Sequence, residues 1–263
     1  MEFCSLYSGS SGNSIFIGSD NARVLIDAGL PGKKITEALD TIGQNPKELD
    51  GIFITHEHTD HIKGVGVLSR KYDIPIYAPY NTWVAMKDSL GKIAEHNIKI
   101  MDRRSTVTIK DIDIKSFIIP HDAVAPVGYT VNCNGKLASV ATDFGIFTRE
   151  IYDSIKDSEI ILIESNYNPQ MLDMGPYPYN LKQRIKGVEG HLSNEECGEA
   201  IVEILKNGLG KNIILGHLSN TNNTPELAEL TVKDIITENN IKLGSDVLLS
   251  MANRYKPSKL ITL

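Results

Sequence analysis

The chain alternates between short apolar runs and segments whose apolar residues recur at helical spacing. Short runs rich in β-branched residues predict strands, and apolar residues three or four positions apart predict amphipathic helices. We expect strands at residues 1–6, 14–18, 23–26, 51–54, 74–78, 107–110, 112–119, 127–133, 136–142, 160–164, 212–215 and 247–249. We expect helices at residues 33–42, 61–72, 81–90, 148–156, 193–206 and 225–238.

These predicted elements come in two sets, each of which begins with strands and then mixes strands with helices. This order predicts two sheets packed face to face with helices on their outer sides. The expected fold is therefore a four-layer αββα sandwich of the α/β (α+β) class. A chain of 263 residues can bury such a core, and we expect one domain over residues 1–263.

One segment, residues 165–190, has no clear period and is rich in Pro, Tyr and Gly. A loop of this length in a compact domain is usually functional or disordered. The helix that follows has a defined start, because Ser193 and Glu196 stand at the spacing of a capping box.

The composition is that of an ordinary globular protein, with 41% hydrophobic and 23% charged residues. No apolar run has the length of a membrane span, and the N-terminus lacks the pattern of a signal peptide. The three cysteines, at positions 4, 133 and 197, have no paired spacing and are expected to be reduced thiols. These features predict a cytoplasmic protein with no membrane partner.

The formal net charge of −6 argues against a protein that coats nucleic acid through a general positive field. Two bound divalent ions would change this charge to −6 + 4 = −2 and would concentrate the positive charge in one pocket. Any contact with nucleic acid is therefore expected to be local.

The densest chemistry lies directly after the predicted strand 51–54, where His56, His58, Asp60 and His61 fall within six positions. In an extended loop His56, His58 and Asp60 point to one side, and His61 approaches from another. Imidazole and carboxylate groups at this density are costly to bury unless a cation pairs with them. Because one cation takes three or four protein ligands, four candidates here and more downstream indicate two cations. A solvated turn is the disfavoured alternative.

Further candidates follow the apolar runs of later predicted strands or precede a predicted helix, which is where sheet folds gather functional groups. They are His121, Asp143, His191 and His217. His96 has no such context, and no role is assigned to it.

Two features near the N-terminus have two interpretations each. Asp27 ends the predicted strand 23–26 and either orients a metal-bound histidine or caps the following turn. The turn at residues 8–13 is either an anion-binding nest or a simple hairpin connection.

The spacing His56-x-His58-x-Asp60-His61, with the later His and Asp residues, resembles the metallo-β-lactamase superfamily, whose signature is HxHxDH. The resemblance implies one metal site of His56, His58 and His121. It implies a second site of Asp60, His61 and His217, with Asp143 bridging the two. His191 is similar to the extra histidine of the phosphodiesterase branch, which includes RNase Z.

Within this superfamily the chain resembles the YycJ/WalJ group of bacterial metallohydrolases. The segments that carry the resemblance are residues 8–13, 120–123 and 126–129 and the pentapeptide Gly-His-Leu-Ser-Asn at 190–194 and 216–220. The group implies 5′-to-3′ exonuclease action on DNA. Where its members often have His-Asp, this chain has Tyr167-Asn168, and the role of that loop is left open.

Two cations of zinc or manganese are expected, because His-rich ligand sets favour zinc while two carboxylates permit manganese. Together they make a bridging hydroxide available as the nucleophile. Asp60 is expected both to bind metal and to steer the hydroxide. His191 is expected to be the general acid for the leaving alkoxide, and its rival role is to orient a bridging group.

Lys182, Arg184 and Lys186 lie just before His191, in the same segment as Tyr177 and Tyr179. Cations alternating with aromatic residues suit a phosphate backbone with stacked bases, and a solvated charged loop is the alternative. Three alternative functions are a small-molecule phosphodiesterase, a thioester hydrolase of the glyoxalase II type and a catalytically idle binding module. The oligomeric state is not predicted.

Overall fold

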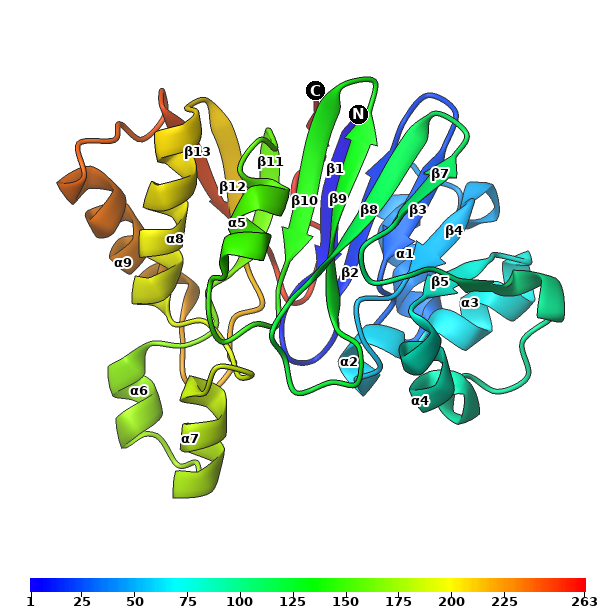
Figure 1. Cartoon of the computed structure of the whole chain (residues 1–263), viewed down its shortest axis with the longest axis horizontal. Helices are drawn as coiled ribbons and strands as arrows, with labels where there is room; N and C mark the ends of the chain where they lie inside the picture. The colour runs from blue at the N-terminus through cyan, green and yellow to red at the C-terminus, as the bar shows by residue number, and fades with distance from the viewer. The chain divides into compact units, whose positions relative to one another are not determined.

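The computed structural model describes residues 1–263, and the chain folds into two units (Figure 1). Unit 1 comprises Met1–Phe117, Ala123–Lys136 and Asn253–Leu263, and unit 2 comprises Ile118–Asp122 and Leu137–Ala252. The expectation of one domain over the whole chain stays a prediction. None of the helices combines the length and the apolar character needed to cross a membrane.

Unit 1 is built on a seven-stranded sheet with the strand order β14-β1-β2-β3-β4-β5-β6. Its strands are β1 (Glu2–Tyr7), β2 (Ser14–Gly18), β3 (Arg23–Ile26), β4 (Gly51–Phe53), β5 (Ile76–Ala78), β6 (Ile98–Ile100) and β14 (Ile261–Thr262). The pairs from β14 to β3 are antiparallel, and those from β3 to β6 are parallel. The parallel part places the carboxyl ends of β3 and β4 at one edge.

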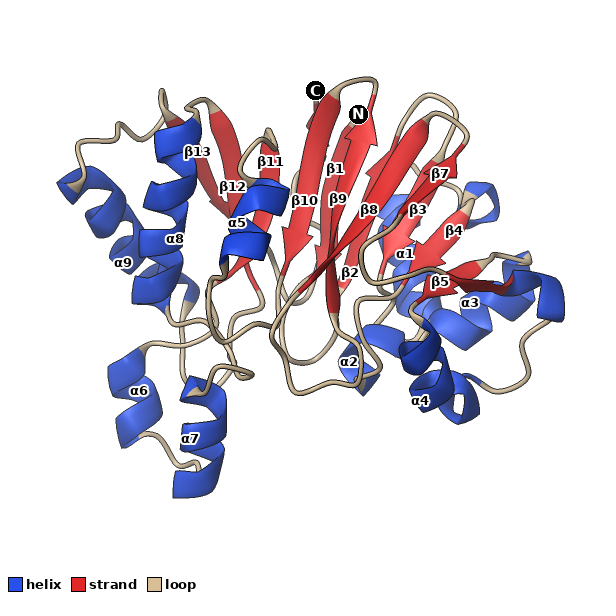
Figure 2. Ribbon diagram, in the orientation of Figure 1, coloured by secondary structure: helices blue, strands red, loops and turns tan.

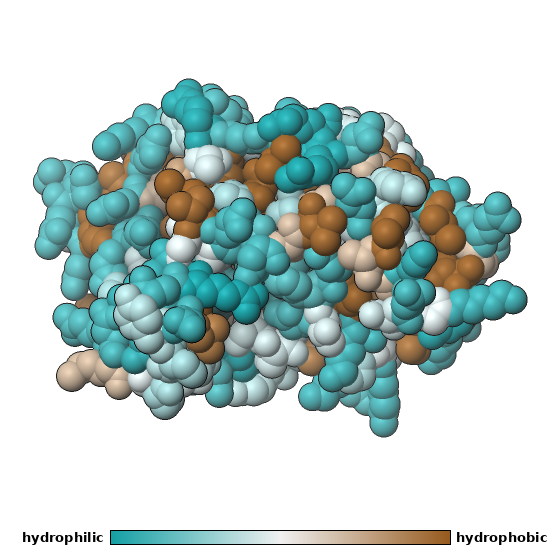
Figure 3. Space-filling view, turned by 60° about the horizontal axis from the view of Figure 1, so that its bottom comes forward, coloured by the Kyte–Doolittle hydropathy of each residue, from teal (hydrophilic) through white to brown (hydrophobic).

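Helices and a second set of strands complete unit 1. The helices are α1 (Gly32–Thr41), α2 (Thr59–Ile62), α3 (Val65–Tyr72) and α4 (Tyr80–Leu90), with 3-10 turns η1 (Pro46–Glu48) and η2 (Glu95–Asn97). The further strands are β7 (Thr106–Ile109), β8 (Ile112–Ile118) and β9 (Val127–Cys133), in the spatial order β9-β8-β7. Figure 3 shows apolar residues at several separate places on the visible face, among them the side where α3 and α4 lie in Figure 1.

Unit 2 holds four parallel strands in the order β13-β12-β11-β10. They are β10 (Lys136–Ala141), β11 (Ile160–Glu164), β12 (Lys211–Gly216) and β13 (Val247–Met251). The helices are α5 (Arg149–Ile155), α6 (Pro169–Met174), α7 (Tyr179–Lys186), α8 (Asn194–Asn207) and α9 (Pro225–Glu238), as Figure 2 shows. Strand β11 is buried along its whole length, as an inner parallel strand requires.

Most predicted elements are confirmed within a few residues, and the capping box of Ser193 and Glu196 at the start of α8 is confirmed. Two expectations were wrong. The helix predicted over 61–72 is interrupted, because the chain passes from α2 to α3 at Gly64, whose N–H donates to Ala28 O. The segment expected as a long loop, 165–190, contains the helices α6 and α7. The short strands β6 and β14 were not predicted.

Tyr129 of β9 links its strand to the end of β4 and is fully buried. Its ring meets Phe53 edge-on, with ring centroids 5.8 Å apart, and its hydroxyl donates to Ile54 O at 2.7 Å. This contact anchors the chain two residues before His56.

We predict that Tyr129→Phe lowers the free energy of unfolding by about 1–3 kcal/mol, because the Ile54 carbonyl loses its buried donor. Denaturant unfolding of wild type and variant measures the change. The matched control is Tyr80→Phe at an exposed position, for which we expect a change within about 0.5 kcal/mol. Equal stabilities for the two variants would contradict the prediction.

Candidate metal centre

In unit 1 the candidate ligands follow two neighbouring parallel strands. Asp27 comes directly after β3, and the loop at residues 55–61 comes after β4. Because parallel strands end at the same edge of a sheet, the two segments meet there, and Asp27 N–H donates to Phe53 O at 2.8 Å.

Asp27 is buried and fixes both the loop at residues 55–61, called the motif loop below, and the His61 ring. Its carboxylate accepts from the Thr55 N–H at 2.9 Å and the Thr55 hydroxyl at 2.7 Å, and Oδ2 lies 2.7 Å from His61 Nδ1. Burial raises the pKa of Asp27, while His61 opposes this effect. When His61 Nδ1–H donates to the Asp27 carboxylate, the lone pair of the His61 ring lies on Nε2. The geometry thus favours the orienting role over a simple turn cap.

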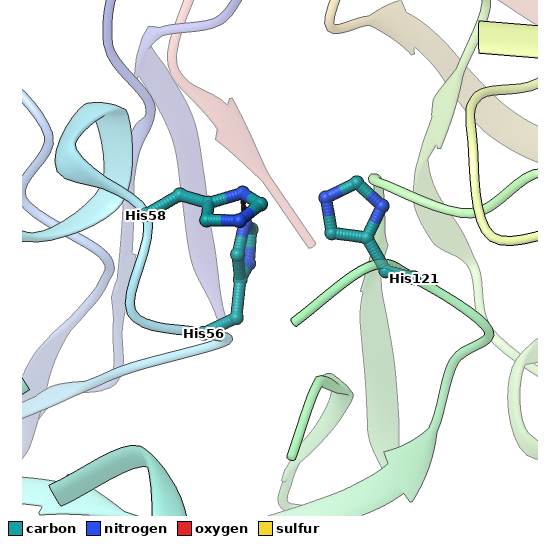
Figure 4. Close-up of side chains that lie close together, drawn as sticks. All are labelled: His56, His58 and His121. Carbon is teal, nitrogen blue, oxygen red and sulfur yellow. Dashed lines mark hydrogen bonds between the residues drawn. The ribbon is translucent and has the colours of Figure 1, made fainter. Parts of the chain in front are cut away.

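His56 and His58 turn toward each other on the same loop, with their rings at 80° (Figure 4). His56 Nε2 lies 3.1 Å from His58 Nδ1. Two nitrogens bound to one tetrahedral zinc at about 2.0–2.1 Å are separated by roughly 3.3 Å. The pair is therefore spaced as two ligands of a single ion.

His61 and Asp60 present a second pair of candidate metal-ligand atoms, with His61 Nε2 3.6 Å from Asp60 Oδ2. Asn13 Nδ2 also lies 3.1 Å from His61 Nε2, a contact that sequence reasoning missed. The only signal for Asn13 was its place in the polar turn at residues 8–13.

Backbone contacts bind this loop to the segment after β3. Asn13 N–H donates to Asp60 O, Gly29 N–H to Asn13 O and Ala28 N–H to His61 O, all within 2.9 Å. The approach is so close at Gly29 that a Cβ there would lie 1.6 Å from Asp60 O. Only glycine fits this position.

In unit 2 the strands β10, β11 and β12 are parallel neighbours, and each ends in a candidate side chain. Asp143 follows β10, Glu164 is the last residue of β11 and His217 follows β12. Asp143 has φ 63° and His217 has φ 54°, and Asp27 in unit 1 has φ 59°. Such left-handed backbone in non-glycine residues costs about 1–3 kcal/mol each and is typical of functional sites.

Glu164 is the functional residue that the sequence reasoning did not identify. Its Oε1 lies 2.8 Å from Nδ1 of both His191 and His217, and its Oε2 accepts from Phe144 N–H. Burial opposes ionisation, but His191 and His217 together hold the pKa of Glu164 well below its usual range. The signal was its place at the end of an apolar strand, the same signal that identified Asp143 and His217.

Asp143 and the remaining histidines of unit 2 converge around these contacts. Asp143 Oδ1 lies 3.3 Å from His217 Nε2 and 3.9 Å from His121 Nε2. His121 Nδ1 lies 3.3 Å from Gly190 O, and burial lowers the pKa of His121, which favours the neutral, metal-binding imidazole. Asp143, Glu164, His191 and His217 each offer an atom within 4.8 Å of the others.

His191 differs from its neighbours in exposure. Its side chain is 23% exposed, against 3% for His121 and 2% for His217. Burial opposes protonation of His191, but the Glu164 carboxylate raises the pKa of His191 above its usual value.

The residues predicted to bind substrate lie on α7, where the cations contact acidic residues of unit 2. Arg184 pairs with Asp122, Lys186 pairs with Asp173, and Lys182 Nζ donates to Asp173 O at 2.7 Å. Tyr179 is 73% exposed. A phosphate would have to compete with the carboxylates, and the substrate-binding role of these four residues stays a prediction.

The Tyr167-Asn168 departure has a local explanation. Asn168 caps α6, because its side chain accepts from the Met171 N–H at 3.0 Å. Tyr167 is buried. Asn168 therefore supports the start of α6, while Tyr167 O accepts from Asn194 N–H at the start of α8.

The chain is similar to several known proteins. Residues 22–217 match the model of the β-lactamase superfamily domain. The chain is 44% identical over 243 residues to the exodeoxyribonuclease WalJ of Streptococcus pneumoniae (serotype 2, strain D39), a match that covers 92% of this chain and 90% of that protein. It is 38% identical over 261 residues to the exodeoxyribonuclease YycJ of Bacillus anthracis, covering 99% and 98%.

The crystal structure of the metallo-β-lactamase fold protein YhfI from Bacillus subtilis is similar at a TM-score of 0.71 and 15% identity. This similarity covers 98% of this chain and 99% of that chain. The predicted αββα sandwich, with mixed sheets flanked by helices, is confirmed.

We predict that Gly29→Ala weakens metal binding by about 10–100-fold, because the added Cβ displaces the Asp60 backbone and with it the motif loop. Elemental analysis of protein equilibrated with zinc or manganese measures the change, and circular dichroism checks folding. Gly208→Ala is the control, since a Cβ there meets nothing within 4 Å. Normal metal content in folded Gly29→Ala protein would refute the prediction.

Proposed function

This chain belongs to the metallo-β-lactamase superfamily of metal-dependent hydrolases, and from that premise we propose that it is an exodeoxyribonuclease. The observation that carries the proposal is 44% identity to a protein of that activity over 92% of the chain. We infer further that digestion runs in the 5′-to-3′ direction and takes place in the cytoplasm. Both of these refinements rest on the sequence alone.

We propose two divalent ions, zinc or manganese, as the cofactors. The first would be held by His56, His58 and His121 and the second by Asp60, His61 and His217, with Asp143 as the bridging carboxylate. The donor chemistry of each unit fits such ions. His56 and His58 offer nitrogens at the spacing of ligands, and Asp27 and Glu164 hold Nδ1 protons so that Nε2 of His61 and His217 carries the lone pair.

The bound ions supply Lewis acidity, which lowers the pKa of water and neutralises the charge that develops on the phosphodiester. The residues of the chain do the rest. Asp60, with a side chain that is 27% exposed, accepts a proton from the attacking water and orients the resulting hydroxide toward the phosphodiester. His191 donates its Nδ1–H to Glu164 and holds a second proton at Nε2, which it gives to the leaving alkoxide.

The surroundings of His191 favour its role as a general acid over the alternative role of orienting a bridging group. A ring that donates Nδ1–H to a buried glutamate and is partly open to solvent suits proton transfer to a substrate. Orientation of a bridging group would not need the exposure of the ring. We therefore keep the general-acid assignment.

The proposal is tested on 5′-labelled single- and double-stranded DNA and, in parallel, on a thioester substrate. We expect metal-dependent release of mononucleotides that a chelator stops. Asp60→Ala should reduce this activity by about 10²–10⁴-fold, because the aiming carboxylate is lost. The matched control is Asp88→Ala at an exposed position of α4. Efficient thioester cleavage with inert DNA would instead favour the glyoxalase II type of activity.

We predict that His191→Ala lowers turnover by about 10²–10⁴-fold and retains both metal ions, since the general acid is removed while the proposed ligands remain. Turnover assays and elemental analysis on the same preparation measure the two effects. His96→Ala is the control, because the His96 side chain is exposed and pairs with the exposed Asp73. Metal loss in His191→Ala would reassign His191 as a ligand.

A further inference from the structure

We propose that Ser10, Ser11 and Arg254 form a phosphate-binding subsite for the DNA strand that the chain digests. The inference rests on the proposed function, and it names residues beyond the metal-binding and catalytic set. All three residues belong to unit 1, as does the loop that carries Asp60 and His61.

The turn at residues 8–13 is held rigidly from within, and two of its three serines, Ser10 and Ser11, are exposed. Asn13 Oδ1 accepts from Gly9 N–H at 2.9 Å, Asn13 Nδ2 donates to Gly9 O at 3.2 Å, and Gly12 N–H donates to Gly9 O at 2.9 Å. Gly9 and Gly12 are buried, whereas Ser10 and Ser11 are exposed. This rigidity presents two hydroxyls at a fixed place.

Arg254 lies against this turn. Its Nη1 is 3.4 Å from Ser10 Oγ and 3.5 Å from Ser11 Oγ, and a Cβ on Gly9 would lie 3.0 Å from its Cζ. The missing side chain at Gly9 is thus what allows the guanidinium to reach both serines. A guanidinium with two hydroxyl donors is a donor set that matches the oxygens of a phosphate.

The C-terminal turn that carries Arg254 is itself fixed to the sheet. Ser8 N–H donates to Asn253 O at 3.1 Å, Ser258 N–H donates to Ser5 O at 2.9 Å, and Asn253 Oδ1 accepts from Tyr255 N–H at 2.8 Å. The next side chain, Tyr255, is 76% exposed. An exposed aromatic ring beside a phosphate-binding cation is the combination that single-stranded nucleic acid prefers.

The subsite is connected directly to the candidate metal centre. Asn13 ends the turn, and it contacts the Asp60 carbonyl through its N–H and His61 Nε2 through its side chain. Ser10 is three Cα steps away, a reach of at most about 11 Å. Successive phosphates of one DNA strand rise by about 3.4 Å in a duplex, so the subsite lies within a few nucleotides of the reacting phosphate.

The net charge of the chain makes an individual cation near the metal centre important for binding DNA. The chain has a formal net charge of −6, so DNA needs a local positive group. Arg184 and Lys186 of α7 contact the carboxylates of Asp122 and Asp173. The Arg254 guanidinium lies at long hydrogen-bond distances from the hydroxyls of Ser10 and Ser11, and a charged phosphate oxygen is a stronger acceptor than a hydroxyl.

The test measures binding and digestion by the metal-loaded protein. Fluorescence anisotropy with a phosphorothioate oligonucleotide gives Kd, and the variants are Arg254→Gln, Arg254→Lys and the double variant Ser10→Ala/Ser11→Ala. The control is Arg149→Gln, which removes the same charge from an exposed position of α5. Each protein is assayed on oligonucleotides with a 5′-phosphate and with a 5′-hydroxyl.

We expect Arg254→Gln to raise Kd about tenfold or more and to reduce the slope of log Kd against log salt by about 0.7. The double variant should show a smaller rise, and Arg254→Lys should bind between wild type and Arg254→Gln. Loss confined to 5′-phosphorylated DNA identifies the terminal phosphate as the occupant. Equal loss on both oligonucleotides identifies an internal phosphate.

The outcomes distinguish a failure of the proposed subsite from a failure of the proposed function. Wild-type protein that neither binds nor digests DNA overturns the proposed function and the subsite with it. Wild-type protein that digests DNA, with Arg254→Gln unchanged in Kd and salt slope, overturns the subsite alone. Loss of metal from Arg254→Gln with the wild-type salt slope would show that Arg254 merely supports the turn, and would also overturn it.

Discussion

Two buried carboxylates orient three of the seven histidines of this protein. Asp27 in unit 1 and Glu164 in unit 2 are each within 2.8 Å of imidazole Nδ1 atoms. A buried carboxylate is costly unless its oxygens are satisfied, and here backbone N–H groups and imidazoles satisfy them. The same contacts fix the tautomer and the direction of the rings. The stability of each unit and the chemistry of its histidines therefore depend on the same hydrogen bonds.

Parallel strands explain why such contacts arise twice. In each unit neighbouring parallel strands end at one edge, and the side chains that follow them come together without a dedicated scaffold. Asp27, Asp143 and His217 also adopt left-handed backbone at these strand ends. That conformation turns the chain sharply out of the sheet, and its cost of about 1–3 kcal/mol per residue must be offset by the contacts of the site.

The sequence predicted most of this arrangement because strand ends and apolar runs are local signals. The strands of both units and the polar residues that follow them, such as Asp143 and His217, were recognisable on that basis. Glu164 also ends an apolar strand, but its role depends on two histidines more than 25 residues away, at separations of 27 and 53 positions. The break at Gly64 was missed for a similar reason, since it depends on Ala28 O. Tertiary contacts of this kind leave no periodic trace.

An acidic chain that acts on DNA must solve a problem of charge placement. A general positive field is excluded by the composition, and the cations of α7 contact Asp122 and Asp173. Attraction for the substrate then has to come from bound metal ions and from individual cations close to them. Such short-range attraction acts on the strand only near the reacting phosphate and leaves the rest of the DNA unbound. An enzyme that removes one nucleotide at a time benefits from this restriction, because the shortened strand must move by one phosphate after each cleavage.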